Sequence, residues 1–157
     1  MKIHKIDISD FNEVNYELIA LNTILDDYHL CFQINQKLAI SLQRNRQDIL
    51  YQGKVDIEGF SIFSFEDDFQ DVYWSLVQNQ KWSSFSTDIN TLFAESQQKL
   101  YLLPEYKNVD FFLKIENAEY SDDELLEIIS KLKDIKNVTA VFRVDVAALK
   151  SKNNLIF

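Results

Sequence analysis

The amino-acid sequence predicts an α+β fold: a mixed, mostly antiparallel sheet with two helices packed on one face. Apolar residues alternate with polar ones in several short segments, as they do in β-strands. Near the C-terminus, a segment between two such strands repeats its apolar residues at helical spacing. The 157 residues, 46% of them hydrophobic, are enough for a single globular domain, 1–157, with a sizeable core.

The clearest pattern is a C-terminal βαβ unit. Residues 109–116 alternate as a half-buried strand. Ser121 is followed three residues later by Glu124, a capping box that marks a helix N-terminus. The stripe of a core-facing helix follows at Leu125, Ile128, Ile129, Leu132 and Ile135. Asn137 is expected to cap this helix, and residues 138–146 predict a second strand, reached by a right-handed crossover if the two strands are parallel.

The middle of the chain predicts an antiparallel pair of strands. Residues 55–65 and 72–80 are strand-like and flank the polar connection 66–71. Gly59 interrupts the first of these strands, so we expect a β-bulge there. Residues 81–99 are the most polar stretch, and we expect them to form a mobile loop with a short helix.

The N-terminal third predicts a strand, a helix and a second strand. Residues 14–23 favour a strand. Asp26 or Asp27 can cap a helix that ends at Leu38, because a carboxylate can accept from the free amides of the first turn. Residues 39–46 then alternate as a strand.

The net charge of −9 argues against partners that are themselves anionic. The nearest basic pairs, Arg44 with Arg46 and Lys150 with Lys152, are small, whereas phosphate backbones need several clustered cations. We therefore expect no nucleic-acid and no membrane partner. No segment has the length of a membrane-spanning helix, and residues 1–10 lack the apolar run of a signal peptide. A cytoplasmic protein is the expectation.

Catalytic and metal-binding motifs are missing from the sequence. The lone Cys31 sits among apolar neighbours and predicts a small buried residue rather than a reactive thiol. His4 and His29, the only imidazoles, belong to no metal-binding pattern. The acidic run 66–71 lacks the glycine of an EF-hand loop and predicts a solvated turn. No catalytic residue, cofactor or metal is expected, and the balance is against an enzyme.

Two segments contain candidate interaction residues. Pro104 fixes a turn before the strand at Val109, and the nearby carboxylates can accept hydrogen bonds from loop amides. This segment is either a structural turn or a recognition loop. The apolar C-terminus in the tail 150–157 either packs on its own domain or inserts into a partner or twin subunit. The candidates are Pro104, Glu105, Asp110, Phe111, Leu155, Ile156 and Phe157.

The first of these segments is Leu103-Pro104-Glu105, three residues, then Val109-Asp110-Phe111. It resembles the signature of the IPExxxVDY family, a group of small uncharacterised bacterial proteins. Leu103 replaces an isoleucine and Phe111 a tyrosine, so the hydroxyl of that ring is missing here. Residues 16–20, 27–28 and 150–157 also resemble the family. The resemblance implies a bacterial origin and offers no activity, cofactor or catalytic residue to transfer.

Two functional hypotheses follow. The first is a non-catalytic protein-binding or self-associating module, because exposed aromatic residues are natural interface anchors and the acidic charge attracts basic partners. The alternative is a small-metabolite-binding protein or enzyme with an aromatic-lined pocket. The candidates to line that pocket are Trp74, Trp82, Tyr101 and Tyr106.

Overall fold

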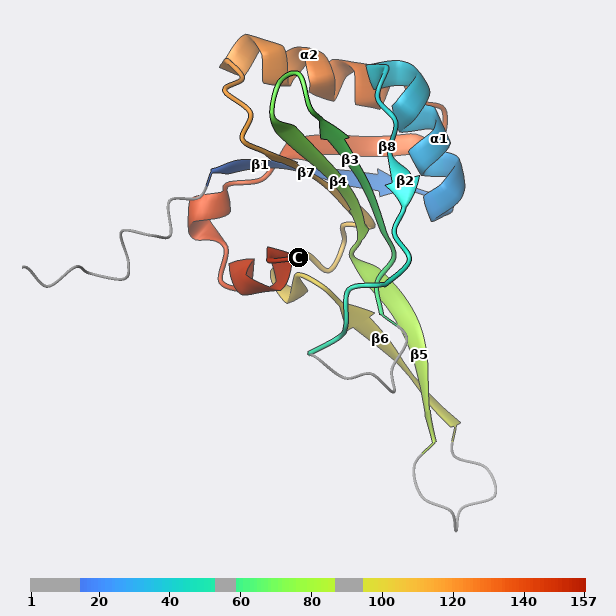
Figure 1. Cartoon of the computed structure of the whole chain (residues 1–157). Coiled ribbons are helices and arrows are strands. Elements are labelled where there is room, and N and C mark those ends of the chain that lie inside the picture. The colour runs from blue at the N-terminus through green and yellow to red at the C-terminus, as the bar shows by residue number, and fades with distance from the viewer. Residues whose placement is uncertain (1–14, 53–58, 87–94) are drawn as a thin grey trace, which may run out of the picture.

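The structure is a computed structural model that describes residues 15–52, 59–86 and 95–157 (Figure 1). Its centre is a six-stranded sheet in the order β2-β3-β4-β7-β1-β8, in which each strand runs antiparallel to its neighbours. The strands are β1 Tyr16–Thr23, β2 Gln43–Arg44, β3 Ile62–Asp67, β4 Val72–Gln78, β7 Phe111–Glu116 and β8 Val138–Arg143. The α+β class and the mostly antiparallel sheet are confirmed.

Both helices, α1 Asp27–Leu38 and α2 Asp122–Lys133, lie on the same face of the sheet (Figure 1). Strands β7 and β8 each pair antiparallel with β1, so they are parallel to one another with β1 between them. The predicted C-terminal βαβ unit is therefore present in its split form. Alternate strand residues and one stripe of each helix form the first core, which includes Ile19, Leu21, Leu30, Ile34, Leu113, Ile129 and Leu132.

Helix α1 has the predicted start and end. The Asp26 carboxylate accepts from the His29 amide at 2.9 Å, which makes Asp26 the N-cap. The helix ends where Ala39 takes a left-handed conformation with φ 54°. The Asn35 side chain then bonds both backbone groups of Leu42, at 2.8 and 3.0 Å. Since those groups are unavailable to a neighbouring strand, the strand predicted over 39–46 is wrong except at β2.

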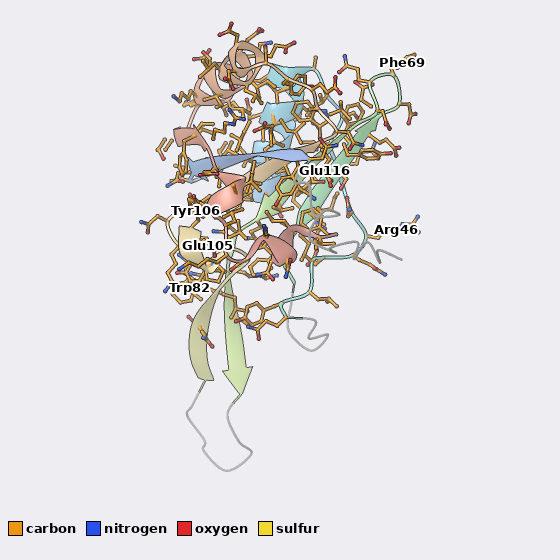
Figure 2. All side chains as sticks on the ribbon, turned by 90° about the vertical axis from the view of Figure 1, so that its left-hand side faces the viewer. Arg46, Phe69, Trp82, Glu105, Tyr106 and Glu116 are labelled. Atoms are coloured by element: carbon orange, nitrogen blue, oxygen red, sulfur yellow. The ribbon has the colours of Figure 1, made fainter. Side chains whose placement is uncertain are left out.

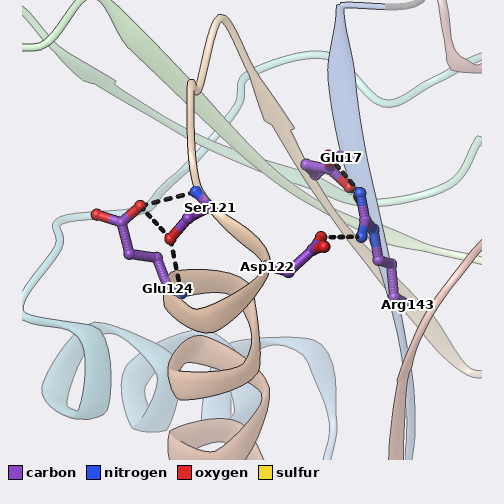
Figure 3. A network of polar contacts seen from close by, with 5 residues as sticks. All are labelled: Glu17, Ser121, Asp122, Glu124 and Arg143. Carbon is purple, nitrogen blue, oxygen red and sulfur yellow. Dashed lines mark hydrogen bonds and ion pairs between the residues drawn. The ribbon is translucent and has the colours of Figure 1, made fainter.

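Helix α2 begins with the predicted capping box (Figure 3). The Ser121 hydroxyl accepts from the Glu124 amide at 3.3 Å, and the Glu124 carboxylate accepts from the Ser121 amide at 2.7 Å. At the other end the cap is Asp134, and Asn137 instead adopts φ 71° in the turn before β8. The prediction of Asn137 as the cap is wrong, because the helix ends three residues earlier.

Among the described residues, no α-helix lies over the second face of the sheet. Leu18, Ala20, Val77 and Phe112 of the sheet are covered there by a loop at 102–109 and by the C-terminal segment, which includes the 3₁₀ turns Val146–Ala148 and Lys152–Leu155. Figure 1 shows these turns on the side opposite the helices. Strand β7 is consequently buried on both sides, and the prediction of a half-buried strand is wrong.

Residues 81–99 contain two strands where a loop with a short helix was predicted. Strands β5 Gln80–Ser86 and β6 Glu95–Tyr101 pair with each other from Gln80↔Tyr101 to Ser86↔Glu95 and project from the body (Figure 1). Serine and glutamine occupy facing positions along the pair, so the hairpin forms without the apolar alternation that marks strands in a sequence. Residues 87–94 lie outside the described part of the chain.

Two expectations for the middle of the chain also change. Residues 55–58 of the predicted strand lie outside the described residues, and β3 begins only at Ile62. Gly59 allows two backbones to approach, since a Cβ there would lie 2.4 Å from the Ile49 carbonyl oxygen. This close approach of the two backbones explains the glycine at position 59 without a β-bulge. The acidic run 66–71 covers the end of β3 and the exposed turn into β4, where the Asp67 carboxylate accepts from the Phe69 amide; the predicted polar connection is present.

Ser121→Ala is expected to lower the free energy of unfolding by about 1 kcal/mol, because the first turn of α2 loses its cap. Urea denaturation followed by circular dichroism measures this change. Ser130→Ala, an exposed position in the same helix, is the matched control and should stay within about 0.5 kcal/mol of the parent. Equal midpoints for the two variants would show that the capping box does not stabilise the helix.

Candidate protein-binding surface

The segment 103–111 is held to the body by a buried asparagine. Asn79, between β4 and β5, is fully buried. Its side-chain amide donates to the carbonyls of Tyr106 and Val109, both at 2.9 Å, and its side-chain oxygen accepts from the Leu103 amide at 2.8 Å. Pro104 begins the 3₁₀ turn Pro104–Tyr106, which lies within the segment that the Asn79 side chain binds. The segment is therefore a fixed turn.

Glu105 binds the C-terminal segment to this turn. One of its carboxylate oxygens accepts from the amides of Lys150 and Ser151, at 3.0 and 2.9 Å. Partial burial alone would raise the pKa of Glu105, but the hydrogen bonds from Ser151 and Lys150 outweigh it and lower that pKa. The prediction that Glu105 accepts from loop amides is confirmed, and those amides belong to the tail.

Asp110 and Phe111 also serve the fold. The Asp110 carboxylate accepts from the Thr23 amide at 2.9 Å and from the Gln80 side-chain amide at 3.0 Å. It thereby joins the end of β1 to the start of β5. Phe111 is buried in the core beneath the helices. These contacts agree with the interpretation of the segment as a structural turn and not with a free recognition loop.

The tail docks on its own domain around a buried lysine. Lys114 of β7 is only 3% exposed. Its ammonium donates to the Leu155 carbonyl at 2.8 Å and pairs with Glu116 at 2.8 Å. It also lies 4.9 Å from the ring centre of Tyr16 and 4.8 Å from that of Phe157. Sequence reasoning missed Lys114, although its neighbour on the same strand face, Phe112, was a sign that this face is covered.

The last two residues remain accessible although Leu155 is buried. Ile156 is 77% exposed, and Phe157 keeps part of its ring in solvent. Ile156 lines a hollow of about 220 Å³ together with Leu50, Tyr101 and Pro104. Of the predicted interaction residues, Pro104 and Ile156 therefore lie together at the surface, at the base of the hairpin.

One face of the hairpin carries aromatic rings and ammonium groups in alternation. Trp82 of β5 faces Lys99 of β6, whose ammonium lies 5.6 Å from the Trp82 ring centre and 5.9 Å from that of Tyr101. Lys107 lies 5.8 Å from the same Tyr101 ring. Trp82 is 64% exposed, and Figure 2 shows it where the hairpin joins the body. We call these four residues the hairpin surface: Trp82, Lys99, Tyr101 and Lys107.

The four aromatic residues predicted to line one pocket do not converge. Trp74 is buried beneath the helices, where its ring lies 6.3 Å from Tyr120. Tyr106 packs edge-on against Phe112 at 6.0 Å on the other face of the sheet. Only Trp82 and Tyr101 share a surface, through Lys99. The prediction of that pocket is wrong, because alternation along β4 directs Trp74 to the helix side.

A different hollow, of about 560 Å³, opens on the second face of the sheet beside the tail. Its lining mixes carboxylates, hydroxyls, amides and rings, and includes Ser64, Tyr73, Ser75, Glu116 and Phe157. Glu116 is already paired with Lys114. The hollow is open to solvent, and the Tyr73 hydroxyl on its lining is hydrogen-bonded to the Glu66 carboxylate, which raises the pKa of Tyr73.

Cys31 and His29, two of the titratable residues considered in the sequence analysis, make contacts that fit a role in the fold. Burial, with the Asp27 carboxylate nearby, raises the pKa of Cys31 to about 11, so the thiol is protonated at neutral pH. The prediction of a small buried residue is confirmed. His29 pairs with Asp26 at 2.8 Å beside the start of α1, and His4 lies outside the described residues. No group of three metal-ligating side chains occurs among the residues that were described.

Comparison with known proteins gives no relative. No family model, no curated protein and no solved structure matches the chain. The resemblance to the IPExxxVDY family, based on residues 103–111 and on residues 16–20, 27–28 and 150–157, thus stays a hypothesis. In the described ranges, neither helix is long and apolar enough to cross a membrane.

Glu105→Gln is expected to lower the free energy of unfolding at pH 7 by roughly 0.5–1 kcal/mol, because a charged acceptor for the tail amides becomes neutral. The folded-state pKa of Glu105 lies below its ordinary value. The charge therefore stabilises fully above the ordinary value and loses its effect as the pH falls through the lowered one. Urea denaturation from pH 7 to pH 3 should show the two proteins converging.

The matched control for this pH series is Glu119→Gln, because the exposed Glu119 carboxylate makes no hydrogen bond or ion pair with another described residue. This variant should follow the parent at every pH. A stability difference for Glu105→Gln that is unchanged at pH 3 would contradict the role of the carboxylate charge.

Proposed function

We propose that this chain is a non-catalytic protein-binding or self-associating module that binds through the hairpin surface. The observation that supports this most is the exposed Trp82, set on a hairpin that projects from the core (Figure 1). Tryptophan is among the residues most enriched at interface hot spots, and here its ring lies beside the ammonium group of Lys99.

The geometry around Trp82 favours binding by a pre-ordered surface. Lys99 lies over the rings of Trp82 and Tyr101, which restricts all three side chains before a partner arrives. Asn79 fixes the base of the hairpin, because its carbonyl also accepts from the Leu102 amide at 2.9 Å. Less side-chain entropy is then lost on association, and this saving increases affinity without adding contacts.

A protein is the partner class that the chain's chemistry favours. The net charge of −9 opposes nucleic acids and anionic membranes. The hairpin surface adds ammonium groups and rings, which suit both polar and apolar contacts in a protein interface. The proposal includes the cytoplasm as the compartment, because the lone cysteine is a buried thiol. It also includes a bacterial origin, if the family resemblance holds.

Trp82→Ala is expected to abolish association, because the central anchor of the interface is lost. Two measurements test this: the mass by light scattering from 1 to 100 μM, and recovery of a stoichiometric partner from a native lysate. The matched control is Leu126→Ala on α2, since Leu126 is 61% exposed and Trp82 64%. It should behave as the parent does.

Two outcomes would contradict the proposal. One is a parent protein that stays monomeric and recovers no stoichiometric partner. The other is association that Trp82→Ala and Leu126→Ala leave equally intact, since binding would then lie elsewhere.

A further inference from the structure

Two cross-strand rows of polar side chains lie on the second face of the sheet, beside the tail. In one row Tyr73 of β4 lies between Glu66 of β3 and Glu116 of β7, which Figure 2 labels. In the next row Ser75 lies opposite Lys114. Side chains at opposite positions of antiparallel strands are about 5 Å apart on one face. The rows therefore form the floor of the 560 Å³ hollow, whose lining includes Glu66, Tyr73, Ser75 and Glu116.

Ser75 contributes a buried hydroxyl that the fold leaves without a partner. The residue is only 7% exposed, and it lines the hollow. Its hydroxyl makes no hydrogen bond to another described residue. Buried hydroxyls are normally satisfied, because losing water without a replacement costs free energy. Alternation along β4 points Ser75 to the same face as Tyr73, so a molecule in the hollow would supply the missing partner.

The charges around the hollow suit a cation. The described residues of its lining include three carboxylates, Asp48, Glu66 and Glu116, and neither lysine nor arginine. Two of these carboxylates are neutralised by neighbours outside the lining, since Arg44 pairs with Asp48 and Lys114 with Glu116. Glu66 pairs with no cation among the described residues. Its charge is therefore left for a ligand.

The same face already binds one ammonium group with similar elements. The ammonium of Lys114 lies against a carboxylate and between two aromatic rings. The hollow offers a second set, with the carboxylate of Glu66 bonded to the hydroxyl of Tyr73, whose ring lies on the lining. Aromatic rings attract cations through their negative faces. The unpartnered hydroxyl of Ser75 adds a hydrogen-bond acceptor for an N–H group.

We propose that this hollow binds an organic cation through its ammonium group, with Glu66 as the counter-charge, Tyr73 as the ring and Ser75 as the acceptor. A volume of about 560 Å³ suits a small organic molecule or a side chain. The site goes beyond the proposed function, because it includes no residue of the hairpin surface. Either can fail without the other. A free amine and a lysine side chain both carry this group, and the test separates them.

Titration with 1,4-diaminobutane at low salt, followed by the amide chemical shifts in NMR spectra, tests the site. The shifts should saturate with a Kd of about 1 mM or below and should be largest around Tyr73 and Ser75. Glu66→Gln and Ser75→Ala should each raise this Kd about fivefold, since one removes the counter-charge and the other the acceptor. The neutral analogue 1,4-butanediol should not bind.

The matched control is Asp123→Asn, which removes an exposed carboxylate from α2 on the opposite face of the sheet. It should leave the Kd unchanged. Ser75→Ala loses no hydrogen bond within the described residues, so its urea midpoint should not fall below that of the parent, which shows that it folds. Equal Kd values for Glu66→Gln and Asp123→Asn would overturn the site, because binding would then reflect only the overall acidic charge.

A second titration uses Nα-acetyl-lysine N-methylamide, which carries the lysine ammonium on a neutral backbone. Tighter binding of 1,4-diaminobutane would assign the site to free amines. Tighter binding of the lysine derivative would assign it to a lysine of a peptide. Both results support an ammonium site, provided that Glu66→Gln weakens them. Absence of saturable binding for both compounds would overturn the inference.

Discussion

The burial of one ammonium group determines how the second face of the sheet is closed. Lys114 lies in the middle of the central strand β7, and an unpaired charge there would cost several kcal/mol. Its compensation comes from Glu116, the ring of Tyr16, and two groups of the tail: the Leu155 carbonyl and the Phe157 ring. Burial of the lysine and docking of the tail therefore depend on each other.

The remaining irregular segments on this face are fixed by single polar side chains in the same way. Glu105 accepts from the two amides that begin the tail, and Asn79 bonds three backbone groups of the 103–109 turn through its side chain. Because Asn79 also lies at the junction between the sheet and β5, the contacts that close the second core hold the hairpin in position. The exposed Trp82 is thus presented by a rigid base, and that is why we place the binding surface there.

The sequence allowed prediction of the parts of the fold that depend on local pattern. Helix α2, its Ser121 capping box and the Asp26 cap of α1 follow from spacings within a few residues. The hairpin could not be predicted, because Ser83 and Ser84 face glutamines and give no apolar alternation. The burial of Lys114 was missed, because Phe112 was its only local sign and the groups that cover the lysine, Tyr16 and the tail, lie more than forty positions away. For the candidate site, Glu105 and Asp110 were identified as acceptors of amides, but not which amides. Nor could the sequence show that Trp74 and Trp82 lie on different surfaces.

A double-mutant cycle between Lys114 and the tail tests this account most directly. The free energy of unfolding would be measured by urea denaturation for the parent, Lys114→Met, a chain lacking residues 155–157, and the combination. The tail satisfies the ammonium, so removing the tail should cost less once Lys114 is methionine. The account predicts a coupling energy of about 1–3 kcal/mol between the two changes. Additive effects, within about 0.3 kcal/mol, would show that the lysine and the tail are independent and would contradict it.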